Sequence, residues 1–199
     1  MITTLDLMRH GEPEGGRKYR GQIDDPLSEK GWAQMRAAVG SAAPWSQIVS
    51  SPLMRCRAFA ETLATQHKLP LAFEPRLKEV GFGAWEGKTS AEIDTATPGA
   101  LTRFKLDPVH ARPPGAEPLA DFQARVAAGL DAVLQQSAGQ HVLVVGHAGV
   151  IRMALAWALH IPLQYAYGIE VASASLTRIC FHRDGRASLI FHGGSLPGR

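Results

Sequence analysis

Short apolar runs alternate along the chain with longer stretches in which apolar residues recur every three or four positions. The short runs predict strands and the longer stretches predict helices, because these are the periods at which each element returns to one face. The run at residues 141–145 is nearly continuous, which is typical of a strand buried on both faces. Strands are therefore expected at residues 2–8, 48–50, 71–73 and 141–145, followed by a hairpin of 175–182 and 187–192 around Asp184 and Gly185.

Helices are expected between these strands. Ser28 can cap a helix that runs to Val39, and Ser51 with Pro52 predicts a second helix start, with Ser51 as the N-cap and Pro52 in the first helical position. Further helices are expected at residues 121–136 and 150–159, with short helical pieces at 91–94 and 100–104. The apolar stripe of the second helix consists of Leu53, Cys56, Ala60 and Leu63.

Strand and helix alternate over most of the chain. This order predicts an α/β fold, a three-layer α/β/α sandwich with a mainly parallel central sheet. Nothing in the composition marks a linker, and 199 residues suit one hydrophobic core, so residues 1–199 are expected to form one domain.

Composition and charge narrow the function classes. The net charge is +3, but Lys and Arg are scattered, so no nucleic-acid partner is expected and the positive balance suits small anionic substrates. No apolar run approaches the roughly 18 residues of a membrane span, and residues 1–8 lack the basic start of a signal peptide. The two cysteines, Cys56 and Cys180, have no metal-site spacing and are expected to be buried free thiols. The sequence therefore predicts a cytoplasmic protein with no membrane partner.

Two predicted strands end with the same type of residue. They run into Arg9-His10-Gly11 and into Gly146-His147-Ala148-Gly149, and ligands of parallel sheets gather at such strand ends. A neutral imidazole can attack phosphorus, and a neighbouring guanidinium matches phosphate oxygens while it disfavours the imidazolium. His10 is thus a candidate nucleophile with Arg9 as its phosphate-binding neighbour, and Gly11 would allow the backbone to approach the ligand. Without a catalytic role, His10 would belong to a solvated loop and His147 to a hydrogen-bonded turn.

Three further charged residues complete the set of candidates. Arg55 is expected near the positive end of the second helix, off the apolar stripe and facing away from the core, whereas Arg57 lies nearer that stripe. Glu79 is a candidate proton donor to a leaving alkoxide, because a phosphate dianion bound nearby would favour its protonated form. Glu86 competes for that role, although it could equally be a solvated loop acid.

The segments at residues 7–12, 51–55, 77–87 and 145–149, in this order, resemble the four successive motifs of the histidine phosphatase (phosphoglycerate mutase-like) superfamily. The resemblance implies a metal-free and cofactor-free enzyme, with His10 as the phosphorylated nucleophile and Glu79 as the proton donor. It implies that the phosphate pocket consists of Arg9, Arg55 and His147, with Gly21 and Ala148 as further contacts. The segment of residues 81–118 is expected to form a short loop and helical insert over this active site.

Within that superfamily the chain is most similar to bacterial α-ribazole phosphatases, through residues 19–21, 25–28, 30–36 and 55–56, and through Gly115, Glu117 and residues 121–122 and 125–126. This implies α-ribazole 5′-phosphate, or adenosylcobalamin 5′-phosphate, as the substrate in cobalamin biosynthesis. Pro118 departs from the pattern, since many relatives carry Ser there, and puts a minor substrate contact in doubt. Gly15 and Gly16 stand near an Asn of the mutases and weaken a mutase assignment.

Other functions remain open at this point. One is a broad-specificity sugar or nucleotide phosphatase, and another is a phosphoglycerate mutase, although the short insert and the tail at residues 193–199 give little material for the lid that a mutase needs. A non-catalytic phospholigand-binding module would be expected to lack one of the chemical residues. A metal enzyme using His10, Glu79 and His147 lacks the usual ligand spacing. The expected partner is a small-molecule phosphate ester, and the expected assembly is a monomer or homodimer.

Overall fold

The computed structural model describes residues 2–41 and 43–196, and a single mixed sheet organises this part of the chain. The strand order is β3-β2-β4-β1-β5-β6. The first four of these are mutually parallel, β5 runs antiparallel to β1, and β6 runs antiparallel to β5. The strands are β1 (Ile2–Arg9), β2 (Gln47–Ser50), β3 (Leu71–Phe73), β4 (His141–Gly146), β5 (Leu176–His182) and β6 (Ala187–Gly194).

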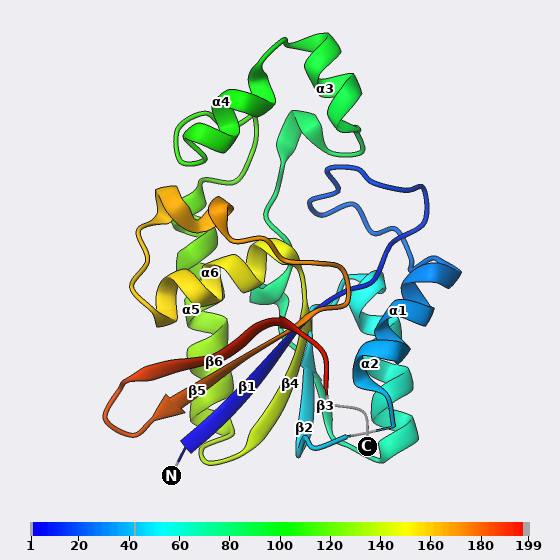
Figure 1. Ribbon diagram of the computed structural model, residues 1–199, viewed down its shortest axis with the longest axis vertical. Coiled ribbons are helices and arrows are strands. Elements are labelled where there is room, and N and C mark those ends of the chain that lie inside the picture. The colour runs from blue at the N-terminus through cyan, green and yellow to red at the C-terminus, as the bar shows by residue number, and fades with distance from the viewer. Residues whose placement is uncertain (1, 42, 197–199) are drawn as a thin grey trace.

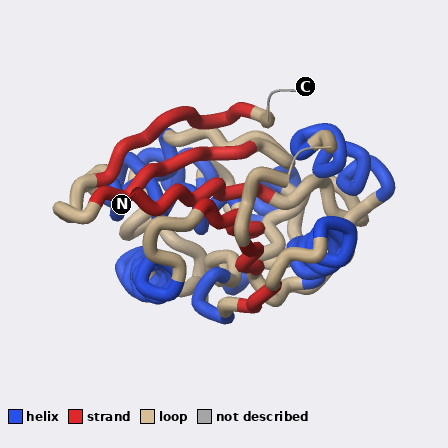
Figure 2. Tube along the Cα trace, turned by 90° about the horizontal axis from the view of Figure 1, so that it is seen from below, coloured by secondary structure: helices blue, strands red, loops and turns tan. Residues whose placement is uncertain are grey.

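Helices cover both faces of the sheet (Figure 1). On one face lie α1 (Glu29–Val39) and α2 (Met54–His67), and on the other lie α5 (Leu119–Gln136) and α6 (Ala148–Ala158). Figure 2 shows β6 at one edge of the sheet, and β3 lies at the other edge. The predicted three-layer sandwich with a mainly parallel sheet is confirmed.

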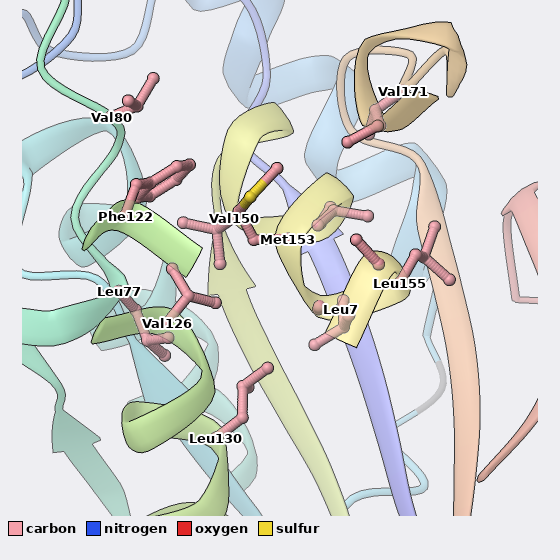
Figure 3. Packing of buried hydrophobic residues seen from close by; sticks show 14 of the residues in the cluster. Leu7, Leu77, Val80, Phe122, Val126, Leu130, Val150, Met153, Leu155 and Val171 are labelled. Carbon is pink, nitrogen blue, oxygen red and sulfur yellow. The ribbon is translucent and has the colours of Figure 1, made fainter. Parts of the chain in front are cut away.

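Alternation along the strands explains the layers. Leu5 and Leu7 of β1 belong to the apolar cluster beneath α5 and α6, whereas Met8 belongs to the cluster beneath α1 and α2. Val144 and Val145 of β4 divide in the same way. In Figure 3, side chains of α5 and α6 pack together with Leu7 over the sheet. Successive residues of a strand point to opposite faces, so each strand serves both cores.

The start of α2 differs from the prediction. Ser51 is not the N-cap, because α2 begins at Met54 and Leu53 occupies the cap position without a side-chain bond. The N–H of Ser51 still donates to the carbonyl of Val145, 2.9 Å away, so the chain is extended there and turns two residues later. Ser28 does cap α1, through a 3.0 Å bond from the N–H of Gly31.

The segment at residues 81–118 rises beyond the carboxyl ends of the parallel strands, at the top of Figure 1. It carries α3 (Ser90–Ala96) and α4 (Ala100–Leu106), which are longer than the expected pieces. Short 3-10 helices at Pro75–Leu77, Gly83–Trp85 and Leu163–Gly168 were not predicted. Edge-to-face aromatic pairs pack the segment at residues 81–118 against its neighbours. In one of them the ring centroids of Phe104 and Tyr167 are 4.8 Å apart.

Pro197, Gly198 and Arg199 of the tail, like Met1, lie outside the described residues. Both cysteines are free as expected, but only Cys56 is fully buried and Cys180 is half-buried. No helix within residues 2–41 and 43–196 is long and apolar enough to cross a lipid bilayer.

Candidate active site

His10 follows β1 directly and is buried, with 7% of its surface exposed. Its Nδ1 lies 2.7 Å from the carbonyl oxygen of Gly11. A carbonyl only accepts hydrogen bonds, so Nδ1 carries the hydrogen and Nε2 keeps a free lone pair. Burial, followed by the charges of Arg55 and Arg9, lowers the pKa of His10 well below its usual value. The ring is therefore neutral at physiological pH, with Nε2 as its nucleophilic atom.

Gly11 has a packing role in this structure. A Cβ at this position would collide with the backbone of Gly31 at the start of α1. The glycine thus permits close packing of the loop after β1 against α1.

His147 stands beside His10 because β1 and β4 are parallel neighbours in register. Arg9 pairs with Gly146 across the ladder, so the next residue of each strand is a histidine at the same edge. The two ring centroids are 5.2 Å apart with an interplanar angle of 67°. His147 is completely buried, and burial, then Arg55 and His10, lower its pKa well below the usual value.

The two predicted phosphate-binding arginines are clamped by backbone carbonyls. Arg9 donates from Nη1 to Val171 over 2.6 Å, and Arg55 donates from Nη1 and Nη2 to Ile23 and Gly21 over 2.7 and 2.8 Å. The Nε–H of each guanidinium is buried and has no partner among the described residues. Two oriented donors without acceptors are what an anion such as phosphate needs.

Arg55 lies outside both apolar clusters, but it is buried rather than solvated. Arg55 is 1% exposed, whereas Arg57 is exposed and pairs loosely with Glu61 over 3.6 Å. The loop of residues 20–27 folds over the start of α2 and buries the side chain that helix geometry alone would leave in water.

Glu79 is half-buried and fixed by two backbone donors. The N–H of Val80 donates to Oε1 over 2.9 Å, and the N–H of Gly149 donates to Oε2 over 3.1 Å. A Cβ at Gly149 would collide with Oε1, so the start of α6 is shaped around this carboxyl group. The charge of Glu79 also acts on the Arg9 guanidinium, which places it at the same site.

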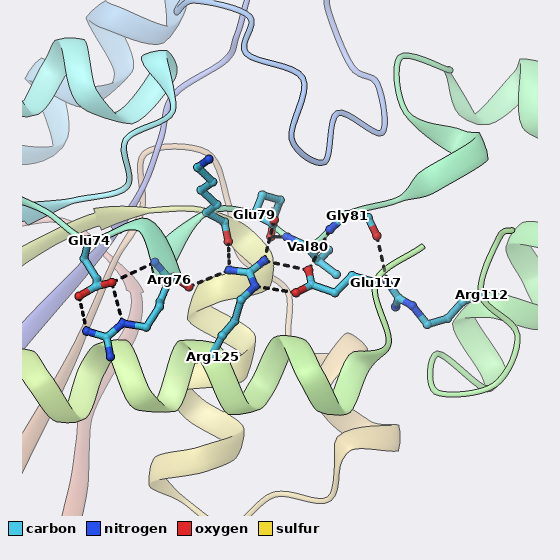
Figure 4. A network of polar contacts seen from close by, with 9 residues as sticks. Glu74, Arg76, Glu79, Val80, Gly81, Arg112, Glu117 and Arg125 are labelled. Carbon is cyan, nitrogen blue, oxygen red and sulfur yellow. Dashed lines mark hydrogen bonds and ion pairs between the residues drawn. The ribbon is translucent and has the colours of Figure 1, made fainter. Parts of the chain in front are cut away.

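Arg125 of α5 holds the segment that carries Glu79 (Figure 4). It donates to the backbone carbonyls of Arg76, Lys78 and Glu79 over 2.7, 2.8 and 3.0 Å. Its other bonds, of 2.6 and 2.8 Å, form a bidentate pair with Glu117, which in turn accepts the N–H of Gly81. The irregular chain around Glu79 is thus held by one guanidinium with satisfied partners.

Glu86 occupies a different place. Its Oε1 accepts the N–H groups of Phe82 and Gln22 over 2.9 and 3.2 Å. It packs against Gly21, whose φ of +53° favours glycine and where a Cβ would collide with the same oxygen. Glu86 therefore joins the loop around Gly21 to the insert.

Two predicted phosphate contacts lie next to the site residues. Gly21 supplies the carbonyl that orients Arg55, and Ala148 is the first residue of α6, directly after His147. Of the N–H groups at the start of α6, that of Gly149 already donates to Glu79. Pro118 is the N-cap of α5 and makes no side-chain bond there.

Sequence reasoning missed two neighbours of His147. Ser51 Oγ lies 2.8 Å from Nε2, and Cys56 Sγ lies 3.6 and 3.8 Å from the two ring nitrogens. Burial raises the pKa of the Cys56 thiol to about 12, so it packs as a neutral group. The available signal was the match of Ser51 and His147 as residues that follow neighbouring parallel strands.

A cavity of about 430 Å³ lies at the other end of the sheet, between α5, α6 and the β5–β6 turn. None of the predicted site residues lines it. No cluster of three or more possible metal ligands occurs within the described residues.

A mainly parallel sheet that presents a neutral buried histidine beside two carbonyl-clamped arginines is typical of α/β proteins that handle phosphate esters. The chain belongs to the histidine phosphatase superfamily (branch 1), whose family model matches residues 5–191. The predicted family resemblance is confirmed.

Several relatives carry this domain in different contexts. The chain is 38% identical over 192 residues to a bifunctional protein of Mycobacterium tuberculosis. The aligned region covers 94% of this chain and 52% of that protein. The chain thus spans about half the length of the first curated relatives that it matches. It is 32% identical over 173 residues to a glucosyl-3-phosphoglycerate phosphatase of Mycolicibacterium vanbaalenii, covering 81% of this chain and 76% of that one.

Solved structures agree with the fold. A mycobacterial glucosyl-3-phosphoglycerate phosphatase superposes with a TM-score of 0.85 at 30% identity, covering 98% of this chain and 100% of that one. The α-ribazole phosphatase of Shigella flexneri superposes with a TM-score of 0.83 over 98% of both chains, but at 23% identity it shares the fold and no more.

Proposed function

We propose that this chain hydrolyses phosphate monoesters through a phosphohistidine formed on Nε2 of His10. The observation that carries the proposal is the bond from Nδ1 of His10 to Gly11, because it leaves a neutral lone pair at the strand end. The unpartnered Nε–H groups of Arg9 and Arg55 supply the charge complement for a phosphoryl group.

The reaction has two displacements. In the first, Nε2 of His10 bonds to phosphorus while the ester oxygen leaves with its electron pair and takes a proton from Glu79. In the second, water attacks the phosphohistidine, Glu79 takes a proton from that water, and inorganic phosphate leaves His10 neutral. Arg9, Arg55 and His147 hold the phosphoryl oxygens during both steps, where negative charge is greatest.

The test is replacement of the nucleophile. His10→Ala should lower kcat by at least about 10³-fold, and acid-labile phosphate should be trapped on the unaltered protein but not on the variant. His110→Ala is the matched control, since His110 is exposed and bonds only to Asp107. A fully active His10→Ala protein, or binding without turnover as in a phospholigand-binding module, would refute the proposal.

Several further arginines favour a leaving group that carries an additional negative charge. Arg152 stacks on Tyr167 at 5.1 Å, and Arg112 stacks on Phe104 at 5.9 Å, with the two rings in contact. The charges of Arg152 and Arg17 both act on Arg9, so they lie near the phosphate pocket. The arginine ion pairs among the described residues belong to Arg20, Arg57, Arg76, Arg125, Arg178 and Arg186.

This surplus of unpaired positive charge fits the carboxylate of a phosphoglycerate derivative better than the uncharged base of α-ribazole 5′-phosphate. The names of the relatives at 30% identity or more support the same choice. The α-ribazole substrate remains the second candidate, supported by the similar stretches at residues 19–21 and 25–28.

A substrate panel separates the two. Glucosyl-3-phosphoglycerate should have a higher kcat/KM than α-ribazole 5′-phosphate, and Arg152→Gln should reduce that of the carboxylate-bearing substrate alone. A preference for α-ribazole 5′-phosphate that survives Arg152→Gln would favour the second candidate.

A further inference from the structure

The hydroxyl of Ser51 and the ring of His147 form a buried pair. Both residues have no exposed surface, and Oγ lies 2.8 Å from Nε2. The pair arises because β2 and β4 are parallel neighbours with Ser50 opposite Val145, so the residues that follow the two strands meet at the same edge.

Nε2 of His147 is the strongest acceptor within reach of the Ser51 hydroxyl. The oxygen of that hydroxyl already accepts the N–H of Leu53 over 3.3 Å. Two groups beside it can take its hydrogen, Nε2 of His147 at 2.8 Å and the sulfur of Cys56, and a thiol sulfur is a weak acceptor. If Nε2 carried a hydrogen, the buried Ser51 hydroxyl would be left with the sulfur, and the loss of a good acceptor costs about 1–3 kcal/mol.

The ring of His147 therefore carries its hydrogen on the other nitrogen. Burial and the nearby charges lower the pKa of His147, so the ring is neutral and has a single N–H. The thiol of Cys56 points its own hydrogen at the carbonyl of Gly146, 3.3 Å away, and its sulfur is nearly equidistant from both ring nitrogens. Nδ1 has no oxygen or nitrogen partner within the described part of the chain, where its one contact is the sulfur of Cys56 at 3.8 Å.

We propose that Ser51 is a positioning residue that donates to Nε2 of His147 and fixes its Nδ1–H tautomer. This tautomer presents one N–H donor to the phosphoryl group held against His10. The inference rests on the proposed function only for the use of that donor, since the tautomer itself is a property of the unliganded protein.

The tautomer is measured by long-range ¹H–¹⁵N spectra of the ¹⁵N-histidine protein, with the His147 signals assigned by their absence in His147→Asn. The unaltered protein should show a protonated Nδ1 and an unprotonated Nε2. Ser51→Ala removes one oxygen and adds no volume, and it should shift the signals toward the Nε2–H tautomer. Ser50→Ala is the matched control, because Ser50 is equally buried but donates only to the carbonyl of Ser51, 2.9 Å away.

Kinetics test the use of the donor. Ser51→Ala should lower kcat by about 10-fold or more with KM changed by less than about 2-fold, and Ser50→Ala should match the unaltered protein. Retention of the Nδ1–H tautomer in Ser51→Ala would overturn the proposal, as would a tautomer change with unaltered kcat. The tautomer could shift as expected while neither the unaltered protein nor any variant hydrolyses phosphate esters. In that case the positioning by Ser51 stands and the proposed function fails.

Discussion

The two carboxylates of the segment at residues 77–87 have separate tasks at the scale of single residues. Glu79 is held by the N–H groups of Val80 and of Gly149 at the start of α6, whereas Glu86 binds the backbone of Phe82 and Gln22. A proton donor must reach the leaving oxygen, and Glu79 is the one placed beside Arg9 and His147.

Glu79→Gln should therefore affect substrates according to their leaving groups. An alkoxide needs a proton to leave and a nitrophenolate does not, so turnover of a sugar phosphate should fall by at least about 10²-fold more than that of p-nitrophenyl phosphate. Steady-state kinetics on both substrates measure this gap. Glu86→Gln is the control, and a leaving-group-dependent loss in that variant instead would reverse the assignment.

The low pKa of His10 sets the pH dependence of the reaction. Burial first, and then Arg55 and Arg9, lower this pKa well below 6.5. Protonation removes the nucleophilic lone pair, so kcat/KM should stay level as the pH falls through 6.5 and should decline only at more acidic pH. A pH profile with p-nitrophenyl phosphate checks this, and a decline centred near 6.5 would contradict it.

A buried carboxylate ties several elements together. Asp6 of β1 has no exposed surface and accepts bonds of 2.7–2.9 Å from Trp45 Nε1, His141 Nε2 of β4, and Nε and Nη2 of Arg178 of β5. Burial alone would raise the pKa of Asp6, but the bonds from Arg178, His141 and Trp45 lower it to about 2.

This network predicts a specific loss of stability in acid. The folded pKa of Asp6, about 2, is below the ordinary 3.8, so its contribution is present above pH 3.8 and is lost as the pH falls toward 2. The shift corresponds to about 2 kcal/mol. Asp6→Asn should lower the free energy of unfolding by about 3 kcal/mol at pH 7 and by less at pH 3, as measured by urea denaturation. An equal loss at both pH values would show that the carboxylate charge is not responsible.

At the scale of the whole molecule, one sheet connects all parts of the site. The two apolar clusters share the strands β1, β2, β4 and β5, and we infer that the chain works as one domain with the segment at residues 81–118 above its site. The proposed chemistry uses side chains alone. Turnover should therefore survive exhaustive chelation with EDTA. Loss of activity that one divalent ion restores would indicate a metallophosphatase.

The sequence by itself determined the fold class and the family, and it supplied the candidate site residues. Apolar periodicity depends on local geometry, so it located the strands at Leu71–Phe73 and His141–Gly146 within one residue. His10 and His147 could be paired without coordinates, because parallel strands must bring their carboxyl ends to one edge.

Only the tertiary structure decided how the site residues are held. Arg55 is buried by a loop some 32 residues earlier in the chain, and Ser51 meets His147 across 96 residues. The burial of Arg55 and the contact of Ser51 with His147, in place of its expected helix cap, share one cause. Local patterns assign a side chain to water or to a helix cap, whereas its partner arrives from another segment and depends on how the whole sheet packs.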